Sequence, residues 1–277
     1  MLFSNHLVII RGGGDLATGV AYRLHKAGFP LIVLELDRPL VIRRKVALAT
    51  AVLEGRVTVE DLHAQLAHSP GEALELAQTE TIPVLAAPQI PTFPFTEPPA
   101  SFIVVDARLA KRNIDTRMDQ APLVIALGPG FTAGVDCHAV IETMRGHSLG
   151  RVIWHGPALP NTGTPGIIAG KGAERVLRAP ADGVVVWRLA IGDLVQGGEV
   201  IGEVAGQPVR APFAGVIRGL IAPGTAVSQS LKIGDVDARG DVAACFTISD
   251  KALAIGGGVL EAILTHLNQK SESESQS

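Results

Sequence analysis

The stretch LVIIRGGGD, which runs from Leu7 to Asp15, decides the fold of the N-terminal part. Four consecutive apolar residues are typical of a strand buried on both faces of a parallel sheet, and the three glycines predict a tight turn. Apolar residues then recur at helical spacing from Leu16 to Lys26, and Gly28 is a typical helix stop. A second apolar run, Leu31–Glu35, completes a strand–helix–strand unit with a right-handed crossover.

The same alternation of strands and helices continues to about residue 156 and predicts an open α/β sheet. Further strands are expected near Ile82–Leu85, Phe102–Asp106, Leu123–Leu127 and Arg151–Trp154. Helices are expected at Arg44–Leu53 with a stop at Gly55, from a cap at Thr58-x-x-Asp61 to Ala67, and at Asp136–Met144. The stretch Pro83–Pro99 holds six prolines, which predicts an extended lid or surface strap and excludes a central strand.

The C-terminal part contains an internal repeat with a spacing of 32 residues. The matching positions are Arg178–Val184 with Arg210–Val216, Gly192 with Gly224, and Val195 with Val227. Each copy has short apolar runs between glycine turns, so each is expected to bury its apolar face only against the other. The pattern resembles a biotinyl/lipoyl-type barrel-sandwich hybrid, and coincidental Ala-Pro-Gly turns in a β-rich region are the alternative.

Carrier domains of the biotinyl/lipoyl type hold their prosthetic group on a lysine in the hairpin between the half-repeats. Here that joint falls near Ala205–Gln207, and no lysine occurs between Lys171 and Lys232. We therefore expect no covalent biotin or lipoate. The roles that remain for this region are those of a rigid cap, a docking surface or an interface.

These patterns predict an α/β protein with two domains. The expected parts are a Rossmann-like domain at 1–160, a glycine-rich linker at 161–175, the β domain at 176–250, a C-terminal helix at 251–269 and a disordered tail at 270–277. A homo-oligomer is permitted by apolar edges on the β domain.

Composition narrows the classes of partner and compartment. The net charge of −3 gives no bulk attraction for nucleic acid or an anionic membrane. No apolar stretch reaches the roughly 18 residues of a membrane span. The two cysteines lack disulfide-scaffold spacing, and Met1–Asn5 lacks the positive charge of a signal peptide. We expect a cytoplasmic protein.

The first candidate site is the glycine turn after the opening strand. Gly12-x-Gly14-x-x-Ala17 fits a dinucleotide-binding fingerprint, in which backbone amides such as that of Gly13 face a phosphate at a helix N-terminus. Glu35 ends the second strand, where a carboxylate can accept a ribose hydroxyl. Asp15 would repel a pyrophosphate unless it caps the helix or holds a metal. A purely structural tight turn is the alternative.

A second glycine turn, GPGFTAG, follows the strand Leu123–Leu127 and contains Gly128, Gly130 and Thr132. Ligands in open α/β sheets gather at the carboxyl ends of strands, so both turns are expected to face one crevice. Cys137 lies at the start of a predicted helix, whose dipole would lower the pKa of the thiol and suit it to bind a soft metal or act as a nucleophile. A buried cysteine beside a helix cap is the alternative. No spacing matches a structural zinc site, so no metal centre made wholly of protein ligands is predicted.

Four basic residues follow the strand Phe102–Asp106: Arg108, Lys111, Arg112 and Arg117. They would form a positive rim suited to a phosphate-bearing ligand. A solvated loop face is the alternative.

Three motifs together carry a resemblance to a known family along nearly the whole chain: RGGGDLATG at 11–19, GPGFTAGVDCH at 128–138 and the Arg-Ala-Pro repeats. They resemble the YqeB-like accessory proteins of the selenium-dependent molybdenum hydroxylase system. The resemblance implies a maturation factor, or chaperone, that acts on the molybdenum cofactor or its selenium-modified form before insertion into a hydroxylase. The N-terminal part is similar to the Rossmann-like half of XdhC-type chaperones.

The sequence thus predicts an α/β domain that binds the molybdenum cofactor or a nucleotide used to process it. The expected partner is a molybdenum hydroxylase or its maturation machinery. An NAD(P)-dependent oxidoreductase is a second hypothesis, based on the same glycine turn and Glu35. A non-enzymatic assembly scaffold whose β domain docks the hydroxylase is a third.

Overall fold

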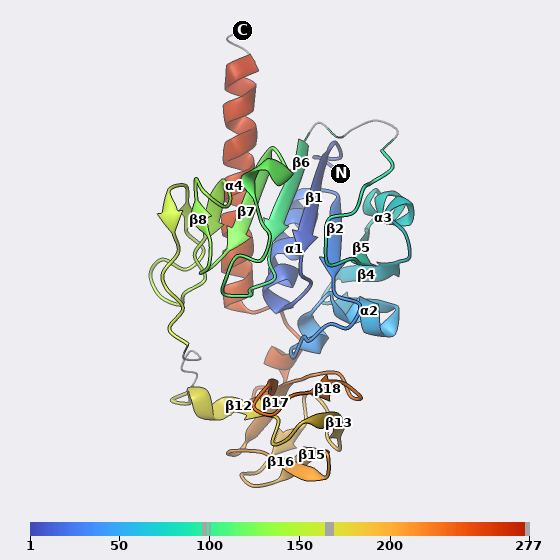
Figure 1. Cartoon of the computed structure of the whole chain (residues 1–277), viewed down its shortest axis with the longest axis vertical. Coiled ribbons are helices and arrows are strands. Elements are labelled where there is room, and N and C mark those ends of the chain that lie inside the picture. Colours follow the sequence, from blue (N-terminus) through green and yellow to red (C-terminus); the bar gives the residue numbers. More distant parts are fainter. Residues whose placement is uncertain (96–98, 100, 164–168, 275–277) are drawn as a thin grey trace. The chain divides into compact units, whose positions relative to one another are not determined.

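The computed structural model describes residues 1–95, 99, 101–163 and 169–274. Two compact units make up the chain (Figure 1). Unit 1 comprises Met1–Pro39, Leu48–Asn161 and Ile248–Ser277, and unit 2 comprises Leu40–Ala47 and Thr162–Thr247. Residues 40–47 therefore group with the β-rich unit and the C-terminal helix groups with the α/β unit. Both assignments differ from the boundaries expected from the sequence.

Unit 1 is built on a nine-stranded sheet with the order β10-β9-β7-β6-β1-β2-β5-β4-β3. The strands are β1 (His6–Arg11), β2 (Leu31–Glu35), β3 (Arg56–Val59), β4 (Leu62–Ala67), β5 (Thr81–Ala86), β6 (Ser101–Asp106), β7 (Leu123–Leu127), β9 (Ala139–Ile141) and β10 (Val152–Ile153). All neighbours from β4 to β9 are parallel, and only the two edge pairs are antiparallel. The predicted open α/β sheet is confirmed.

The order in which the chain enters the sheet reverses beside β1. From β1 the chain moves to β2 and β5 on one side, then crosses to β6, β7 and β9 on the other. The border between β1 and β6 is therefore the topological switch point, where open α/β sheets bind ligands outside the carboxyl ends of the strands.

Two helices of unit 1, α1 (Asp15–Ala27) and α4 (Asp250–Glu274), pack against each other through glycines. A Cβ atom on Gly19 would lie 2.4 Å from the carbonyl oxygen of Ala252, and one on Gly256 would lie 2.3 Å from that of Gly19. The helix α4 also packs on β7, β9 and β10, while α3 (Pro70–Ala77) packs on β2, β4 and β5. None of the described helices is long and apolar enough to cross a membrane.

Two predicted helices are wrong. The segment expected to be helical after Thr58 forms the β3–β4 hairpin, in which Glu60 adopts a left-handed φ of 53°. Burial alternates along the start of β4, with Leu62 and Ala64 buried and His63 exposed, which is the period of a strand. The segment expected to be helical from Asp136 contains β9, whose three residues are buried and pair in parallel with β7.

Smaller differences concern helix ends and prolines. The predicted helix Arg44–Leu53 is split into a 3-10 turn, Arg44–Val46, and a short helix α2, Thr50–Glu54. The strand predicted near Ile82–Leu85 is confirmed as β5, so the exclusion of a central strand from Pro83 onward is wrong. Pro83 is tolerated there because pairing with β2 begins only at Val84. The tail is helical as far as Glu274 and not disordered from residue 270. Residues 96–98 and 100 of the proline-rich segment, 164–168 of the linker and 275–277 of the tail lie outside the described residues.

Unit 2 contains two four-stranded sheets, with the orders β12-β19-β17-β14 and β16-β15-β13-β18. The strands of the first copy are β12 (Val176–Arg178), β13 (Gly183–Trp187), β14 (Leu194–Val195) and β15 (Val200–Val204). Those of the second are β16 (Gln207–Arg210), β17 (Gly215–Leu220), β18 (Ala226–Val227) and β19 (Lys232–Asp237).

The two copies of the repeat exchange strands. Each sheet takes two strands from each copy, and a shift of 32 residues converts one strand order into the other. Equivalent core residues are buried alike, since Val185 and Ile217 are both 0% exposed, as are Ile201 and Ile233. The repeat is therefore structural, and neither four-stranded sheet is built from one copy alone.

Candidate functional site

Polar residues and glycine turns gather at the carboxyl ends of the central strands. Arg11 ends β1, Asp106 ends β6 and Glu35 ends β2, while Gly128 directly follows β7. Because these strands are parallel neighbours, their ends lie along one edge of the sheet, which we call the carboxyl edge. The two predicted glycine turns both belong to this edge.

The first glycine turn is held tightly by neighbouring backbone. Gly12 has a φ of 95°, and a Cβ atom on it would lie 3.0 Å from the Cα atom of Arg108. A Cβ atom on Gly13 would lie 2.8 Å from the amide nitrogen of Ala49, which donates a 2.8 Å hydrogen bond to the carbonyl oxygen of Gly13. Both glycines are therefore required by close approach of the chain itself, whether or not a ligand binds.

Glu35 lies directly on this turn. Its Oε2 atom accepts a 2.8 Å hydrogen bond from the amide of Gly13, and its Oε1 atom accepts one of 2.8 Å from Leu36. The carboxylate thus braces the turn. Each oxygen accepts one of these bonds and has a second lone pair, so acceptance of a ligand hydroxyl stays a prediction.

The helix α1 begins at the same turn without a side-chain cap. Gly14 is the N-cap residue and Asp15 is the first helical residue, so the N-cap position itself supplies no side-chain cap. Ala17 is buried and allows the first turn to pack closely. The positive end of the helix dipole therefore faces the carboxyl edge, which favours an anion.

The second glycine turn is covered by the loop that follows β6. Gly128 and Gly130 have φ values of 75° and 103°, and a Cβ atom on Gly130 would lie 2.6 Å from the backbone of Arg112. The amide of Thr132 donates a 2.7 Å hydrogen bond to the carboxylate of Asp136. The loop that carries the basic residues thus packs onto this turn.

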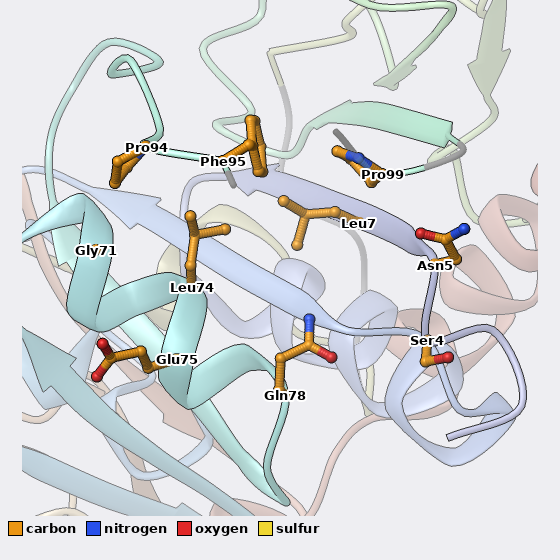
Figure 2. Close-up of a pocket in the computed structure, with 10 residues that line it drawn as sticks. All are labelled: Ser4, Asn5, Leu7, Gly71, Leu74, Glu75, Gln78, Pro94, Phe95 and Pro99. Carbon is orange, nitrogen blue, oxygen red and sulfur yellow. The ribbon is translucent and has the colours of Figure 1, made fainter. Parts of the chain in front are cut away.

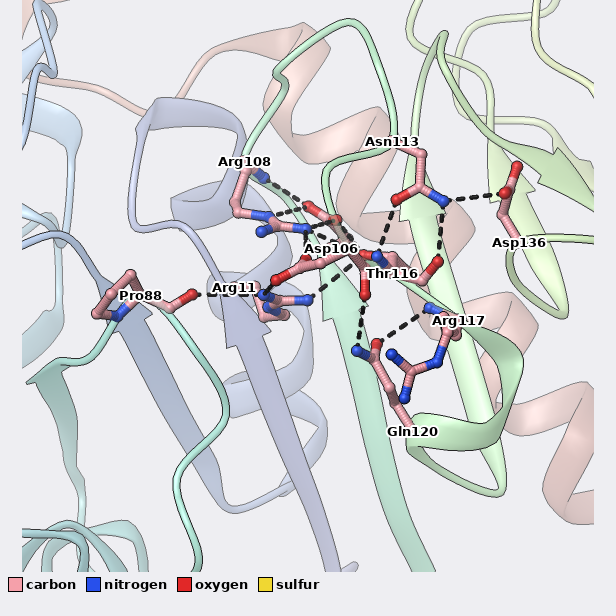
Figure 3. Close-up of polar contacts among 10 residues, drawn as sticks. Arg11, Pro88, Asp106, Arg108, Asn113, Thr116, Arg117, Gln120 and Asp136 are labelled. Atoms are coloured by element: carbon pink, nitrogen blue, oxygen red, sulfur yellow. Dashed lines mark hydrogen bonds and ion pairs between the residues drawn. The ribbon is translucent and has the colours of Figure 1, made fainter.

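A charged network fills the switch point (Figure 3), and we call it the switch-point network. It consists of Arg11, Asp106, Arg108, Asp115 and Thr116. Arg11 pairs with Asp115 at 2.9 Å, and Arg108 pairs with Asp106 at 2.6 Å and with Asp115 at 2.7 Å. The hydroxyl of Thr116 donates a 2.6 Å hydrogen bond to Asp106. Hydrogen bonds from Arg11, and then from Arg108, lower the pKa of Asp115.

Carboxylates neutralise part of the predicted positive rim. Arg108 is neutralised by two carboxylates, and Arg117 pairs with Asp119 at 3.0 Å. The proline-rich segment joins the network, since the carbonyl oxygen of Pro88 accepts a 3.3 Å bond from Arg11. That segment is a packed strap at this point.

Two lysines lack such partners: Lys111, beside the second glycine turn, and Lys251, at the start of α4. Desolvation lowers the pKa of Lys111. Desolvation also lowers the pKa of Lys251, followed by the positive charges of Lys111 and Arg145, whereas Asp15 and Glu142 raise it. Neither ammonium group forms a hydrogen bond or ion pair with any part of the chain that the structure describes. The charge of Lys251 thus interacts with those of Lys111 and Asp15.

Lys251 was not predicted as a site residue. It lies on α4, more than 100 residues after the loop of Lys111, and only the packing of α4 on α1 brings it to the carboxyl edge. No spacing in the sequence indicates that approach.

Cys137 does not meet the conditions predicted for a reactive thiol. It is 0% exposed, it precedes a strand and not a helix, and burial raises its pKa to about 12, assisted by the charges of Asp136 and Asp106. The expected thiolate is wrong. Within the described ranges, no group of three His, Cys, Asp or Glu side chains is arranged to hold a metal ion.

A cavity of about 410 Å³ lies at the opposite end of β1 (Figure 2). Its lining includes Asn5 before β1, Leu74 and Gln78 of α3, and Phe95. Ligands of open α/β sheets bind at carboxyl ends of strands, whereas this cavity lies beside the amino end of β1. It is not part of the candidate site.

Fold and site together define an open α/β protein with an anion-suited carboxyl edge and a duplicated, strand-exchanged β unit. No protein-family model matches the chain. The chain is 51% identical over 265 residues to the protein YqeB of Escherichia coli (strain K12), covering 96% of this chain and 48% of that protein. This identity supports the YqeB-like family, and the chain spans about half the length of that relative.

Two solved structures share 18% sequence identity with parts of the chain. One is an aspartoacylase family protein from Mesorhizobium loti, with a TM-score of 0.22 and coverage of 23% of each chain. The other is a succinylglutamate desuccinylase/aspartoacylase from Rhodobacter sphaeroides, with a TM-score of 0.23 and coverage of 48% of this chain and 57% of that one. These TM-scores are too low to carry an argument about fold or function.

Proposed function

We propose that this chain is an accessory protein for the maturation of a selenium-dependent molybdenum hydroxylase, and that unit 1 binds the molybdenum cofactor or a related nucleotide by its phosphate. The hydroxylase is proposed from the resemblance to the YqeB-like proteins. The phosphate is proposed from one observation, which is the start of α1 at Gly14 with the charge of Lys251 near it, itself within reach of the charge of Lys111.

Positive charge gathers near the start of α1. Desolvation lowers the pKa of Lys251, and the positive charge of Lys111 lowers it further. Desolvation also lowers the pKa of Lys111, although this side chain is exposed. The amides that open α1 add the positive end of the helix dipole. A phosphate at this point would accept hydrogen bonds from the amides and compensate both ammonium groups.

The residues present fit the phosphate of the proposed ligand better than its metal. The start of α1 and the two lysines supply donors and positive charge, which a phosphate needs. Cys137, which the sequence suggested for the metal or its sulfur or selenium ligand, is buried and protonated. The proposal therefore assigns the phosphate only, to Gly14, Lys111 and Lys251.

Unit 2 is proposed to be a biotinyl/lipoyl-like barrel-sandwich hybrid with a docking role. The hairpin that joins the two copies turns at Ala205 and Gly206, between β15 and β16, and has no lysine. We propose that this unit presents a rigid surface to the hydroxylase or its maturation machinery in the cytoplasm.

The test is a calorimetric titration of the full chain with molybdenum cofactor, ATP and NAD, repeated with Gly14→Asp. Gly14 has a φ of −68°, which any residue adopts, and aspartate is a favoured N-cap, so the variant is expected to fold. Its carboxylate would occupy the amides and repel a phosphate. Binding of the cofactor or ATP that is lost in the variant supports the proposal, whereas undiminished binding would sink it. Tight binding of NAD alone would favour the oxidoreductase.

A further inference from the structure

The two copies in unit 2 differ sharply at one position of the repeat. Arg218 in β17 occupies the place that Val186 holds in β13, and Asp237 occupies the place of Ala205. Val186 is 52% exposed, whereas Arg218 is only 8% exposed. The second copy therefore buries a guanidinium group where the symmetry of the fold leaves an exposed valine.

Two local features create this buried position. The register of β17 against β19 shifts between Ile217 and Gly219, which is a β-bulge at Arg218, and bulges re-aim side chains. Residues 40–47 pack along the same part of β17. A Cβ atom on Gly219 would lie 2.7 Å from Ile42, and the Nε atom of Arg44 donates a 2.8 Å bond to the carbonyl oxygen of Leu220.

Arg218 is incompletely compensated in this position. Its nearest carboxylate oxygen is Oδ2 of Asp237 at 3.4 Å, and that carboxylate is held more closely by Arg239, at 2.6 Å. The Nε atom of Arg218 is buried without a hydrogen-bond partner. Desolvation and then the positive charge of Arg43 lower the pKa of Arg218, ahead of the opposing effect of Asp237.

We propose that Arg218 forms the centre of an oxyanion site in unit 2 that binds a phosphate group. A guanidinium group remains charged in proteins, so it cannot relieve its burial by losing a proton. Its Nε–H group belongs to the planar set of donors with which a guanidinium group binds an oxyanion through two parallel hydrogen bonds. A tetrahedral dianion offers oxygens to several donors at once, which suits the positive charge of Arg43 beside Arg218.

This site is distinct from the proposed phosphate site of unit 1, and its test separates the two. The Nε–H resonances of the arginines are recorded in ¹H–¹⁵N spectra of the full chain during titration with inorganic phosphate at constant ionic strength. The resonance of Arg218 is assigned by its absence in Arg218→Val, which restores the residue of the first copy. We expect a saturable shift of this resonance in the wild type and in the Lys111→Gln/Lys251→Gln variant.

Arg188→Gln serves as the matched control, because Arg188 forms an exposed pair with Glu203 in the same unit. This variant should leave the shift of the Arg218 resonance unchanged. An Arg218 resonance that does not move with phosphate, or that moves equally with acetate, would overturn the proposal. If Arg218→Val fails to fold, Arg218→Lys provides the assignment, since lysine keeps the charge but has no Nε–H.

Discussion

Arg11 and Asp115 form a 2.9 Å ion pair between a side chain that is 2% exposed and one that is 37% exposed. Arg11 ends β1, while Asp115 lies on the loop that follows β6. The pair therefore ties that loop across the switch point, where open α/β sheets bind ligands. The pair is one of the contacts that hold the loop that carries Lys111.

Loss of the Asp115 carboxylate should destabilise unit 1. Asp115→Asn leaves the buried guanidinium of Arg11 without its counter-charge, at an expected cost of about 1–3 kcal/mol. Urea denaturation at neutral pH measures the change. Asp119→Asn is the control, since its pair with Arg117 is exposed on both sides and should contribute less than about 1 kcal/mol. Equal effects of the two variants would contradict the role of the network.

The same pair predicts a pH dependence of stability. Arg11 and Arg108 lower the pKa of Asp115 in the folded state from its ordinary value of 3.8. Its contribution is therefore fully present above that value and is lost as the pH falls through the lower folded pKa. The stability difference between wild type and Asp115→Asn should shrink when the pH is lowered below 3.8. A difference that stays constant would show that the carboxylate is not held as described.

Both cysteines should be inert in the native chain. Cys137 and Cys245 are buried free thiols, and burial raises both pKa values, that of Cys137 to about 12. Iodoacetamide reacts with thiolates, so mass spectrometry should show no alkylation of folded protein at mildly alkaline pH and two modifications in urea. Rapid native alkylation of Cys137 would restore it as a reactive residue.

Substitution of two neighbouring glycines of α4 by alanine should change the stability of the protein in opposite directions. A Cβ atom at Gly256 would lie 2.3 Å from the carbonyl oxygen of Gly19, so Gly256→Ala should push α4 from α1 and cost about 1–3 kcal/mol. Nothing lies within 4 Å of a Cβ atom at Gly257, so Gly257→Ala should stabilise the helix by up to about 1 kcal/mol. Thermal unfolding measures both, and similar shifts in the same direction would refute the packing.

The sequence predicted most of the central sheet because each strand is a continuous apolar run, as in Leu7–Ile10 and Leu123–Leu127. It failed where short-range signals are ambiguous. Thr58-x-x-Asp61 imitates a helix cap but forms a hairpin, and Asp136 after a glycine turn suggests a helix start although β9 follows. Pairing with neighbouring strands overrides local propensity at both places.

The site was predictable in part for a similar reason. The glycine turns and Glu35 were found because they follow strands directly. Lys251 comes close to the start of α1 only because α4 packs on α1, which no local spacing encodes. The pairing of Arg108 with Asp115 depends on the path of the loop after β6, which the sequence pattern does not predict either. The repeat was visible at a spacing of 32, but the exchange of strands between its copies arises only from pairing across the two sheets.

The central claim is that Lys251 helps bind a phosphate at the start of α1, and one calorimetric comparison tests it most directly. Molybdenum cofactor is titrated into the wild type, into Lys251→Gln and into Lys26→Gln, whose lysine lies on the same unit in an exposed pair with Asp61. The account predicts at least ~10-fold weaker binding for Lys251→Gln, which is about 1.4 kcal/mol, and wild-type affinity for Lys26→Gln. Equal affinity of all three proteins, or no binding by the wild type, would contradict it.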